Sequence, residues 1–139
     1  MADAIKVTAD AETYCSPLYR PPELYNCPHS GKLDGRIDVW ALGCVLFYMV
    51  AGVNPFEKQC QAGASLVLAV HKAQVPWEGV HVHPDVQELV NSCLRPSFTD
   101  RPTAQEVRAW IAEHHDRICA SSMGSPRAEN GQSSLAKAC

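Results

Sequence analysis

The side chains best suited to chemistry in this sequence are thiols and imidazoles. The chain has seven cysteines and six histidines, which are residue types that ligate zinc. One residue separates Cys27 from His29, and one residue separates His81 from His83. These pairs fall on separate predicted loops and lack the spacing of standard zinc sites. We therefore favour surface histidines over a Cys/His metal module and predict no metal site.

The cysteines also do not predict a disulfide framework. Their number is odd, their spacings are wide and no pair is arranged as C-x-x-C. The first residues have no basic segment followed by an apolar one, so no secretory signal is apparent. We expect a cytoplasmic protein with reduced thiols. Any membrane association is expected only through parts absent from this chain.

Composition and charge limit the class of protein. The 139 residues are 46% hydrophobic and 19% charged, which is typical of one soluble globular domain at most. Twelve basic residues against fifteen acidic ones give a formal net charge of −3. Without a basic excess to neutralise a phosphate backbone, nucleic-acid binding is disfavoured. We expect no nucleic-acid partner and no direct insertion into a membrane.

One uncharged run predicts the central element against which a functional site would be positioned. Residues 39–53 contain no charged side chain, and Asp38 directly before them is a plausible N-cap. A helix through this run would be apolar on every side, so it requires protein around it. A membrane span needs about 20 such residues. The run therefore predicts a buried central helix.

Weaker patterns flank this run. Prolines and aromatic residues are dense from Tyr14 to Pro28, which predicts a structured loop with a short helix near Pro22. Thr103 and Glu106 have the spacing of a capping box. No credible pair of strands is present, so the fold class is mainly α. Amphipathic patterns predict further helices over residues 64–73 and 85–94 and from residue 103 onward.

Four segments, in order, resemble signatures of the C-terminal lobe of protein kinases. They match the end of the activation segment, the start of the central lobe helix, the turn after that helix and the turn before the last lobe helix. The likeness covers roughly residues 11–115 and is closest to the numb-associated kinase family. The matching segments are residues 15–23 (CSPLYRPPE), 38–43 (DVWALG), 52–56 (GVNPF) and 100–102 (DRP).

The resemblance implies a fold and a division of the chain. The fold would be the C-terminal half of the helical C-lobe of a protein kinase-like fold, with no N-lobe sheet. Residues 1–13 would be a flexible remnant of the activation segment, residues 14–116 the partial C-lobe and residues 117–139 a disordered tail. This partial lobe leaves the central helix incompletely covered. Each large apolar side chain left in water costs roughly 1.5–3 kcal/mol, so we expect marginal stability or aggregation.

The implied function is that of a fragment of a serine/threonine protein kinase, which transfers phosphate from ATP to protein Ser or Thr. ATP and Mg belong to the complete family. This chain has no glycine-rich loop, strand lysine, H-R-D or D-F-G motif, so we expect no catalytic residue, no cofactor and no activity from it alone. Its partners would be a protein substrate or the missing kinase segments. The alternative is a non-catalytic short product that acts as a protein-interaction module.

The resemblance also assigns roles to single residues. Ser16 would lie near the catalytic aspartate of the complete family, although a turn serine is the simpler interpretation. Pro17, Leu18 and Tyr19 would shape the pocket for the residue after the phosphoacceptor, which is the P+1 position. We call residues 16–19 the P+1 loop.

The remaining assignments are structural. Glu23 would form a buried ion pair with Arg101. Asp38 would accept backbone hydrogen bonds from the catalytic loop, and Trp40 belongs to the same motif. Val45 and Met49 match positions where the family stacks apolar side chains beneath the adenine pocket. From the sequence alone, they are simply core residues.

Overall fold

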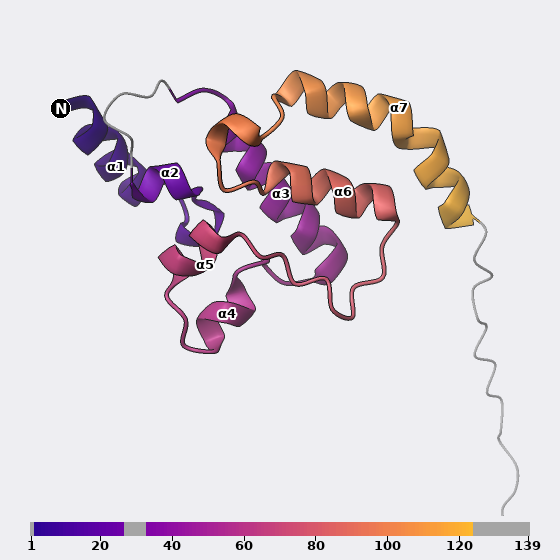
Figure 1. The fold of residues 1–139 in the computed structure, drawn as a ribbon, viewed down its shortest axis with the longest axis horizontal. Helices are drawn as coiled ribbons and strands as arrows, with labels where there is room; N and C mark the ends of the chain where they lie inside the picture. Colours follow the sequence, from indigo (N-terminus) through magenta and orange to yellow (C-terminus); the bar gives the residue numbers. More distant parts are fainter. Residues whose placement is uncertain (1, 27–32, 124–139) are drawn as a thin grey trace, which may run out of the picture.

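The computed structural model describes residues 2–26 and 33–123 and is helical, without strands, over these ranges (Figure 1). The prediction of a mainly α fold is therefore confirmed. Two single-turn 3₁₀ helices, η1 and η2, lie among seven α-helices of the described chain. In order, the elements are α1 (Ala2–Tyr14), η1 (Pro17–Tyr19), α2 (Pro22–Tyr25), α3 (Arg36–Ala51), α4 (Glu57–Gln61), α5 (Leu66–Lys72), α6 (Pro84–Cys93), η2 (Phe98–Asp100) and α7 (Ala104–Met123).

Helix α3 is the centre of the core, as the uncharged run predicts. Helix α6 packs along it, and α7 packs on α6 (Figure 1). The rings of Trp40 and Phe56 are stacked with centroids 5.6 Å apart. The main core cluster joins α3 to α5, α6 and the segment after α3, through Trp40, Cys44, Phe47, Phe56, Ala69, Val70, Val90 and Leu94.

Gly43 allows α3 and α6 to approach closely. A Cβ atom at this position would lie 2.8 Å from Cβ of Cys93 and 2.9 Å from side-chain atoms of Leu94. Such distances are shorter than normal van der Waals contact. The absence of a side chain at Gly43 therefore sets how near the two helices can lie.

The start of α3 differs from the prediction. Asp38 is not the N-cap, because the helix begins at Arg36 after Gly35, and Asp38 lies exposed in its first turn. The carboxylate of Asp34 accepts a hydrogen bond from the backbone N–H of Arg36 at 2.9 Å. Asp34 thus satisfies a free donor at the helix start, where we expected Asp38 to do so.

Residues 2–14 form a helix that the sequence did not predict. We expected a flexible remnant of the activation segment at residues 1–13, but helix α1 runs from Ala2 to Tyr14. The segment contains several alanines, which have the highest helix propensity, and lacks a sustained apolar period. Periodicity alone therefore did not reveal this helix.

The C-terminal boundary also differs. Helix α7 continues to Met123, whereas we placed a disordered tail from residue 117. Residues 124–139 lie outside the described residues.

At the start of α7, the predicted capping box is confirmed. Oε2 of Glu106 accepts from the backbone N–H of Thr103 at 2.7 Å, and Oγ1 of Thr103 accepts from the N–H of Glu106 at 3.3 Å.

One face of α3 lies in solvent. Asp38, Leu42, Val45 and Met49 follow each other at intervals of four, three and four residues, which places them on one side of the helix. All four are exposed, and Met49 is 74% exposed. We call Leu42, Val45 and Met49 the apolar stripe. The interpretation of Val45 and Met49 as core residues of this chain is therefore wrong.

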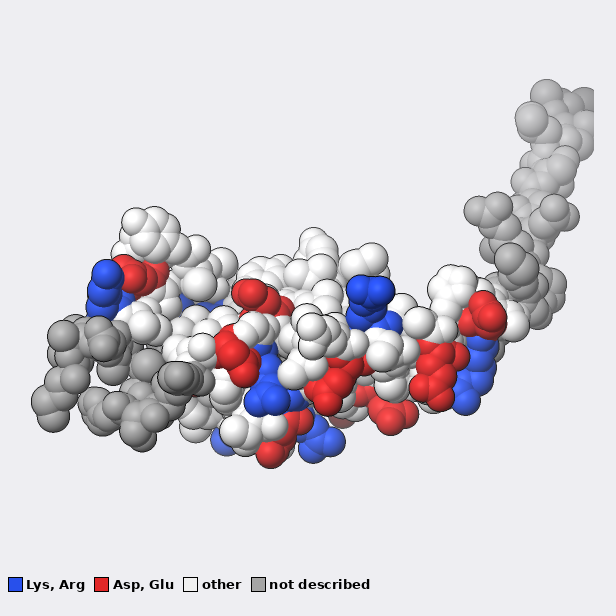
Figure 2. All heavy atoms as spheres, turned by 90° about the horizontal axis from the view of Figure 1, so that it is seen from above, with Lys and Arg blue, Asp and Glu red and all other residues white. Residues whose placement is uncertain are grey.

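No helix in the described ranges is long and apolar enough to cross a membrane. Figure 2 shows acidic and basic side chains interspersed on the face in view, rather than collected into a patch of one sign.

Candidate functional site

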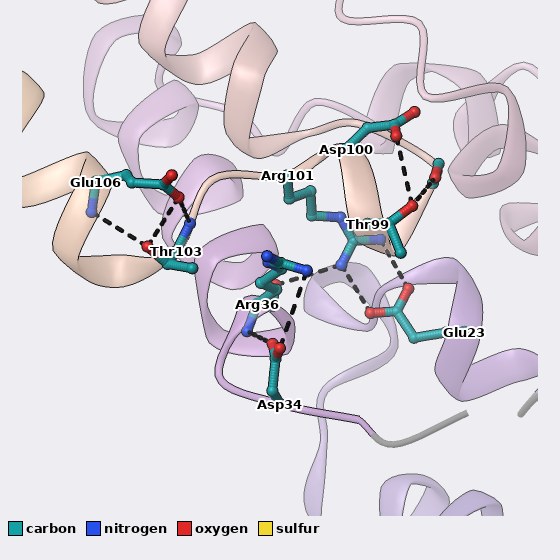
Figure 3. A network of polar contacts seen from close by, with 9 residues as sticks. Glu23, Asp34, Arg36, Thr99, Asp100, Arg101, Thr103 and Glu106 are labelled. Carbon is teal, nitrogen blue, oxygen red and sulfur yellow. Dashed lines mark hydrogen bonds and ion pairs between the residues drawn. The ribbon is translucent and has the colours of Figure 1, made fainter. Parts of the chain in front are cut away.

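The ion pair between Glu23 and Arg101 joins α2 to the segment before α7 (Figure 3). Nη1 of Arg101 donates to Oε1 of Glu23 and Nη2 donates to Oε2, both at 2.7 Å. The side chain of Arg101 has no exposed surface, and that of Glu23 is 7% exposed. The structure thus contains the contact that the resemblance implied, in the planar bidentate geometry that suits a guanidinium.

The other donors of Arg101 are also occupied. Its Nε donates to the backbone oxygen of Arg95 at 2.7 Å, and its Nη groups donate to the oxygens of Arg36 and Pro96 at 3.3 and 3.2 Å. The guanidinium lies 4.8 Å from the centre of the Trp40 ring. A buried charge needs this full set of partners. Arg101 therefore connects α2, α3 and the loop before α7.

The P+1 loop is held through its backbone. The hydroxyl of Tyr25 donates to the oxygen of Pro17 at 2.9 Å, and Nδ2 of Asn54 donates to the oxygen of Leu18 at 3.1 Å. Asn54 is buried after the end of α3. Ser16 and Pro17 are exposed, whereas Leu18 and Tyr19 are half-buried. The loop can therefore present a fixed surface to a partner.

Arg20 provides a second support for this loop. It is buried, and its Nη2 donates to the backbone oxygens of Ala11 at 2.9 Å and Cys15 at 3.1 Å. Its guanidinium lies 5.1 Å from the centre of the Tyr25 ring. Burial raises the pKa of the Tyr25 phenol, against the opposing effect of the Arg20 charge. Tyr25 therefore stays a neutral hydrogen-bond donor near neutral pH.

Sequence analysis missed Arg20 and Asn54. Both lie inside motifs used for the resemblance, at the segments 15–23 and 52–56. Their positions in these motifs were the only available signal. Nothing in local periodicity marks an arginine or an asparagine as a support for a distant backbone.

The structure brings together some assigned residues and separates others. Glu23, Arg101 and Trp40 form one buried cluster. Asp38, Val45 and Met49 lie on the opposite, exposed side of α3. Any contact of Asp38 with a catalytic loop would therefore involve a segment on that exposed side.

The residues present do not fit the metal that kinases use. Among the residues that the structure describes, no three or more His, Cys, Asp or Glu side chains gather to hold a metal ion. His83 instead caps α6, with Nδ1 accepting from the backbone N–H of Asp85 at 3.2 Å, and His81 is exposed. Cys27 and His29 lie outside the described residues.

A cavity of about 490 Å³ lies between α6, η2 and α7. Leu89, Val107 and Trp110 form apolar parts of its wall, and Arg101 also lines it. It contains none of the residues of the P+1 loop. The cavity is thus separate from the surface offered by Ser16.

Comparisons with known proteins agree with this geometry. Residues 1–110 match the model of the protein kinase domain. The chain is 31% identical over 111 residues to serine/threonine-protein kinase ppk13 of Schizosaccharomyces pombe, which covers 79% of this chain and 32% of that protein. It is 36% identical over 89 residues to human serine/threonine-protein kinase 16 and 45% identical to the rat protein, covering 63% of this chain and 29% of each relative.

The chain thus spans less than a third of the length of these relatives. Its helices correspond to the helical C-lobe, and its relatives are serine/threonine kinases. The matched region includes the P+1 loop, α3 and the Glu23–Arg101 pair. The chain belongs to the protein kinase domain family.

Proposed function

We propose that this chain is the part of a serine/threonine protein kinase that receives the protein substrate. The complete protein would transfer phosphate from ATP to a Ser or Thr side chain. The observation that carries the proposal is the P+1 loop, which is exposed at Ser16 and Pro17 while Tyr25 and Asn54 hold its backbone. A preformed loop lowers the ordering cost of binding an extended substrate.

The individual roles in this proposal are those that the family resemblance implies. Ser16 offers a hydroxyl at the exposed end of the loop, where it would approach the phosphoacceptor. Pro17, Leu18 and Tyr19 would form the pocket for the next substrate residue. Asp38 would accept backbone N–H groups of a catalytic loop that packs on the exposed side of α3, and Val45 and Met49 would be covered there.

Catalysis would require groups from outside this chain. ATP and Mg would be bound by the glycine-rich loop, strand lysine and metal-binding aspartate of a complete kinase, so the 139 residues alone would transfer no phosphate. The expected partners are a protein substrate and the other kinase segments, rather than nucleic acid. The expected location is cytoplasmic, without direct membrane insertion.

Within the kinases, we place the chain in the numb-associated family, nearest the myristoylated and palmitoylated serine/threonine kinase. The residues that support this placement are those of segments 19–25, 38–48 and 63–70. The matches to serine/threonine-protein kinase 16 of human and rat also support it.

A chimera tests the proposed function. In human serine/threonine-protein kinase 16, which this chain matches over 89 residues, the segment from the P+1 loop to the last lobe helix would be replaced by residues 14–116 of this chain. We expect the chimera to phosphorylate a serine peptide with ATP. Leu18→Ala should lower kcat/KM for the peptide about tenfold, because it removes apolar contact in the pocket, while the KM for ATP stays unchanged.

The matched control is Leu68→Ala, since Leu68 lies on α5 outside the P+1 loop and is 52% exposed. We expect it to leave peptide kinetics unchanged. A chimera that melts cooperatively and binds ATP, yet phosphorylates neither serine nor threonine peptides, would contradict the proposal. Equal effects of Leu18→Ala and Leu68→Ala would contradict the role of the loop.

A further inference from the structure

The cavity between α6, η2 and α7 has an apolar wall that is already packed. Its volume of about 490 Å³ lies within the range of about 300–1,000 Å³ that is typical of ligand sites. Leu89 and Val107 are 6% and 4% exposed and belong to one core cluster, against which Trp110 packs. All three side chains line the cavity. This part of the wall is therefore formed before any ligand binds.

The indole of Trp110 is held in place from its own helix. The ring of His114 stacks on it, with centroids 3.9 Å apart and 8° between the planes. Nδ1 of His114 lies 2.9 Å from the backbone oxygen of Trp110. An aromatic side chain that is fixed in this way offers a large contact area and loses little freedom when a ligand binds.

The charges on the cavity wall are unbalanced. Three carboxylates from three elements line it: Glu88, Asp100 and Glu106. Two guanidinium groups also line it, but the charge of Arg101 is offset by the buried ion pair with Glu23. Among the lining residues, Arg36 alone then opposes the three carboxylates. A site with this excess of negative charge attracts cationic groups and repels anions.

The carboxylates have oxygens left to accept hydrogen bonds from a ligand. Glu88 is exposed and has no hydrogen bond or ion pair with another described residue. Asp100 accepts from Oγ1 of Thr99 at 3.4 Å, and Glu106 uses Oε2 in the capping box (Figure 3). Since an ionised carboxylate has about four acceptor positions, all three can bind a cation as well.

Arg36 adds an unused donor to the wall. Its Nε is buried and has no hydrogen-bond partner in the described part of the chain. Buried donors in folded proteins normally have a partner, and a carbonyl oxygen of a ligand would supply one. The site thus suits a ligand that combines a carbonyl acceptor, a cation and an apolar group. A peptide with basic and apolar side chains has all three.

We propose that this cavity docks a segment of a partner protein in which basic residues are flanked by apolar ones. The apolar side chains lie against Trp110 and Leu89, the cation meets the carboxylates, and a backbone carbonyl accepts from Nε of Arg36. The site goes beyond the proposed function, since it includes no residue of the P+1 loop.

Titration of the 139-residue chain with acetyl-Leu-Arg-Lys-Leu-amide tests the site, with calorimetry for the Kd and NMR for the location. We expect saturable one-to-one binding that weakens with added salt. Amide signals of α6, η2 and the start of α7 should shift, as should the indole N–H signal of Trp110, whereas signals of the P+1 loop should not.

The chimera described above contains every residue of the cavity and should bind the peptide equally well. Its kinase activity is measured separately with the serine peptide, so the docking site and the proposed function can fail independently.

Three further probes separate the contributions to binding. Acetyl-Gly-Arg-Lys-Gly-amide lacks the apolar side chains, acetyl-Leu-Gln-Gln-Leu-amide lacks the cations, and phenylbutylamine has a cation and an apolar group but no carbonyl. Each should bind at least about tenfold more weakly than the first peptide.

Glu88→Gln should weaken binding about threefold and Glu88→Lys about tenfold, because the contact is an exposed ion pair. The matched controls are Glu113→Gln and Glu113→Lys. Glu113 is exposed on α7 and does not line the cavity, so both controls should bind as the unmodified chain does. Helical circular dichroism should be the same for all four variants, since both positions are exposed.

Three outcomes would overturn the inference. The first is an absence of saturable binding to the folded chain and chimera. The second is equal weakening by Glu88→Lys and Glu113→Lys, which would show attraction by net charge alone. The third is equal affinity for phenylbutylamine, which would show a site for a small organic cation instead of a peptide.

Discussion

At the scale of single residues, Arg101 is a charged side chain that lies in the core. Its charge is fully buried, and Glu23 and three backbone oxygens satisfy it. Burying such a pair costs desolvation free energy. Removing one partner lowers stability further, because the remaining charge stays buried without compensation. The pair therefore fixes α2, which follows the P+1 loop, against the segment before α7, and losing it should lower stability.

Arg101→Lys tests this role. Lysine cannot form two parallel hydrogen bonds to Glu23 or donate to the same three oxygens. We expect the free energy of unfolding to fall by about 1–3 kcal/mol, because buried acceptors lose their hydrogen bonds while the charge is kept, measured by urea denaturation. The control Arg95→Lys changes an exposed arginine whose backbone oxygen remains available, and it should change stability little. Equal stability of the Arg101→Lys variant and the unmodified chain would discredit the pair.

Glu106 gives a pH-dependent effect at the start of α7. Hydrogen bonds from the backbone and hydroxyl of Thr103 lower the pKa of the Glu106 carboxyl. A lowered pKa in the folded state means that the stabilisation is present above the unfolded pKa and is lost as pH falls through the folded value. We expect lower amide protection factors, that is, faster exchange relative to the intrinsic rate at each pH, in the first turn of α7 on acidification, seen by NMR.

Thr103→Ala removes the hydroxyl partner and should shift the titration of Glu106 upward, towards an ordinary glutamate. The backbone hydrogen bond remains in this variant, so the shift should be partial. An unchanged titration would show that the hydroxyl contact is absent in solution.

The residue contacts were only partly predictable from sequence. The ion pair of Glu23 and Arg101 could be expected because each residue stands in a family motif. Arg20 and Asn54 could not, since their targets are backbone oxygens of Ala11, Cys15 and Leu18. Such targets become neighbours only after the chain has folded.

At the scale of elements, α3 was predictable because fifteen uncharged residues allow few alternatives. Its first residue was not, since Gly35 and Asp34 form the start that we assigned to Asp38. Helix α1 was missed because its alanines favour a helix without an apolar period. Helix α7 extends beyond the predicted boundary, and residues 117–120 of this extension are exposed or half-buried.

The packing of α3 on α6 depends on Gly43. Gly43→Ala would place a methyl group against Cβ of Cys93 and the side chain of Leu94 at less than 3 Å. Both neighbours are buried, so relief requires the helices to move apart. We expect a loss of about 1–3 kcal/mol in unfolding free energy, measured by chemical denaturation.

Gly35→Ala is the matched control for this prediction. A Cβ at Gly35 would meet nothing within 4 Å, and its backbone φ is −62°. Any residue can adopt this conformation, so stability should stay the same or rise slightly. A similar effect of both substitutions would contradict the close approach at Gly43.

At the scale of the whole molecule, the described chain covers only part of its central helix. Phe47 is buried, whereas the apolar stripe of Leu42, Val45 and Met49 is exposed. The sequence implied this imbalance, because a helix without charges needs cover on all sides. Which side would be left uncovered depended on the positions of α5 and α6, and those follow from tertiary packing.

Substitutions on the two sides of α3 should therefore affect different properties: solubility on the exposed side and unfolding free energy on the buried side. Met49→Gln should raise the solubility of the 139-residue chain without lowering its unfolding free energy, because it replaces exposed apolar surface. Phe47→Ala should lower that free energy by about 3–5 kcal/mol. Light scattering and urea denaturation measure the two quantities. Lower solubility of Met49→Gln would argue against an exposed stripe.

The proposed function, a part of a larger kinase domain, requires that the apolar stripe of α3 be covered by the rest of that domain. The most direct measurement is the rate at which peroxide oxidises Met49, with free methionine as the reference. In the 139-residue chain, Met49 is 74% exposed, and we expect a rate near the reference. In the chimera with human serine/threonine-protein kinase 16, we expect protection of at least about tenfold, corresponding to ~1.4 kcal/mol of opening free energy. Equal oxidation rates in a folded chimera and in the chain alone would contradict the claim.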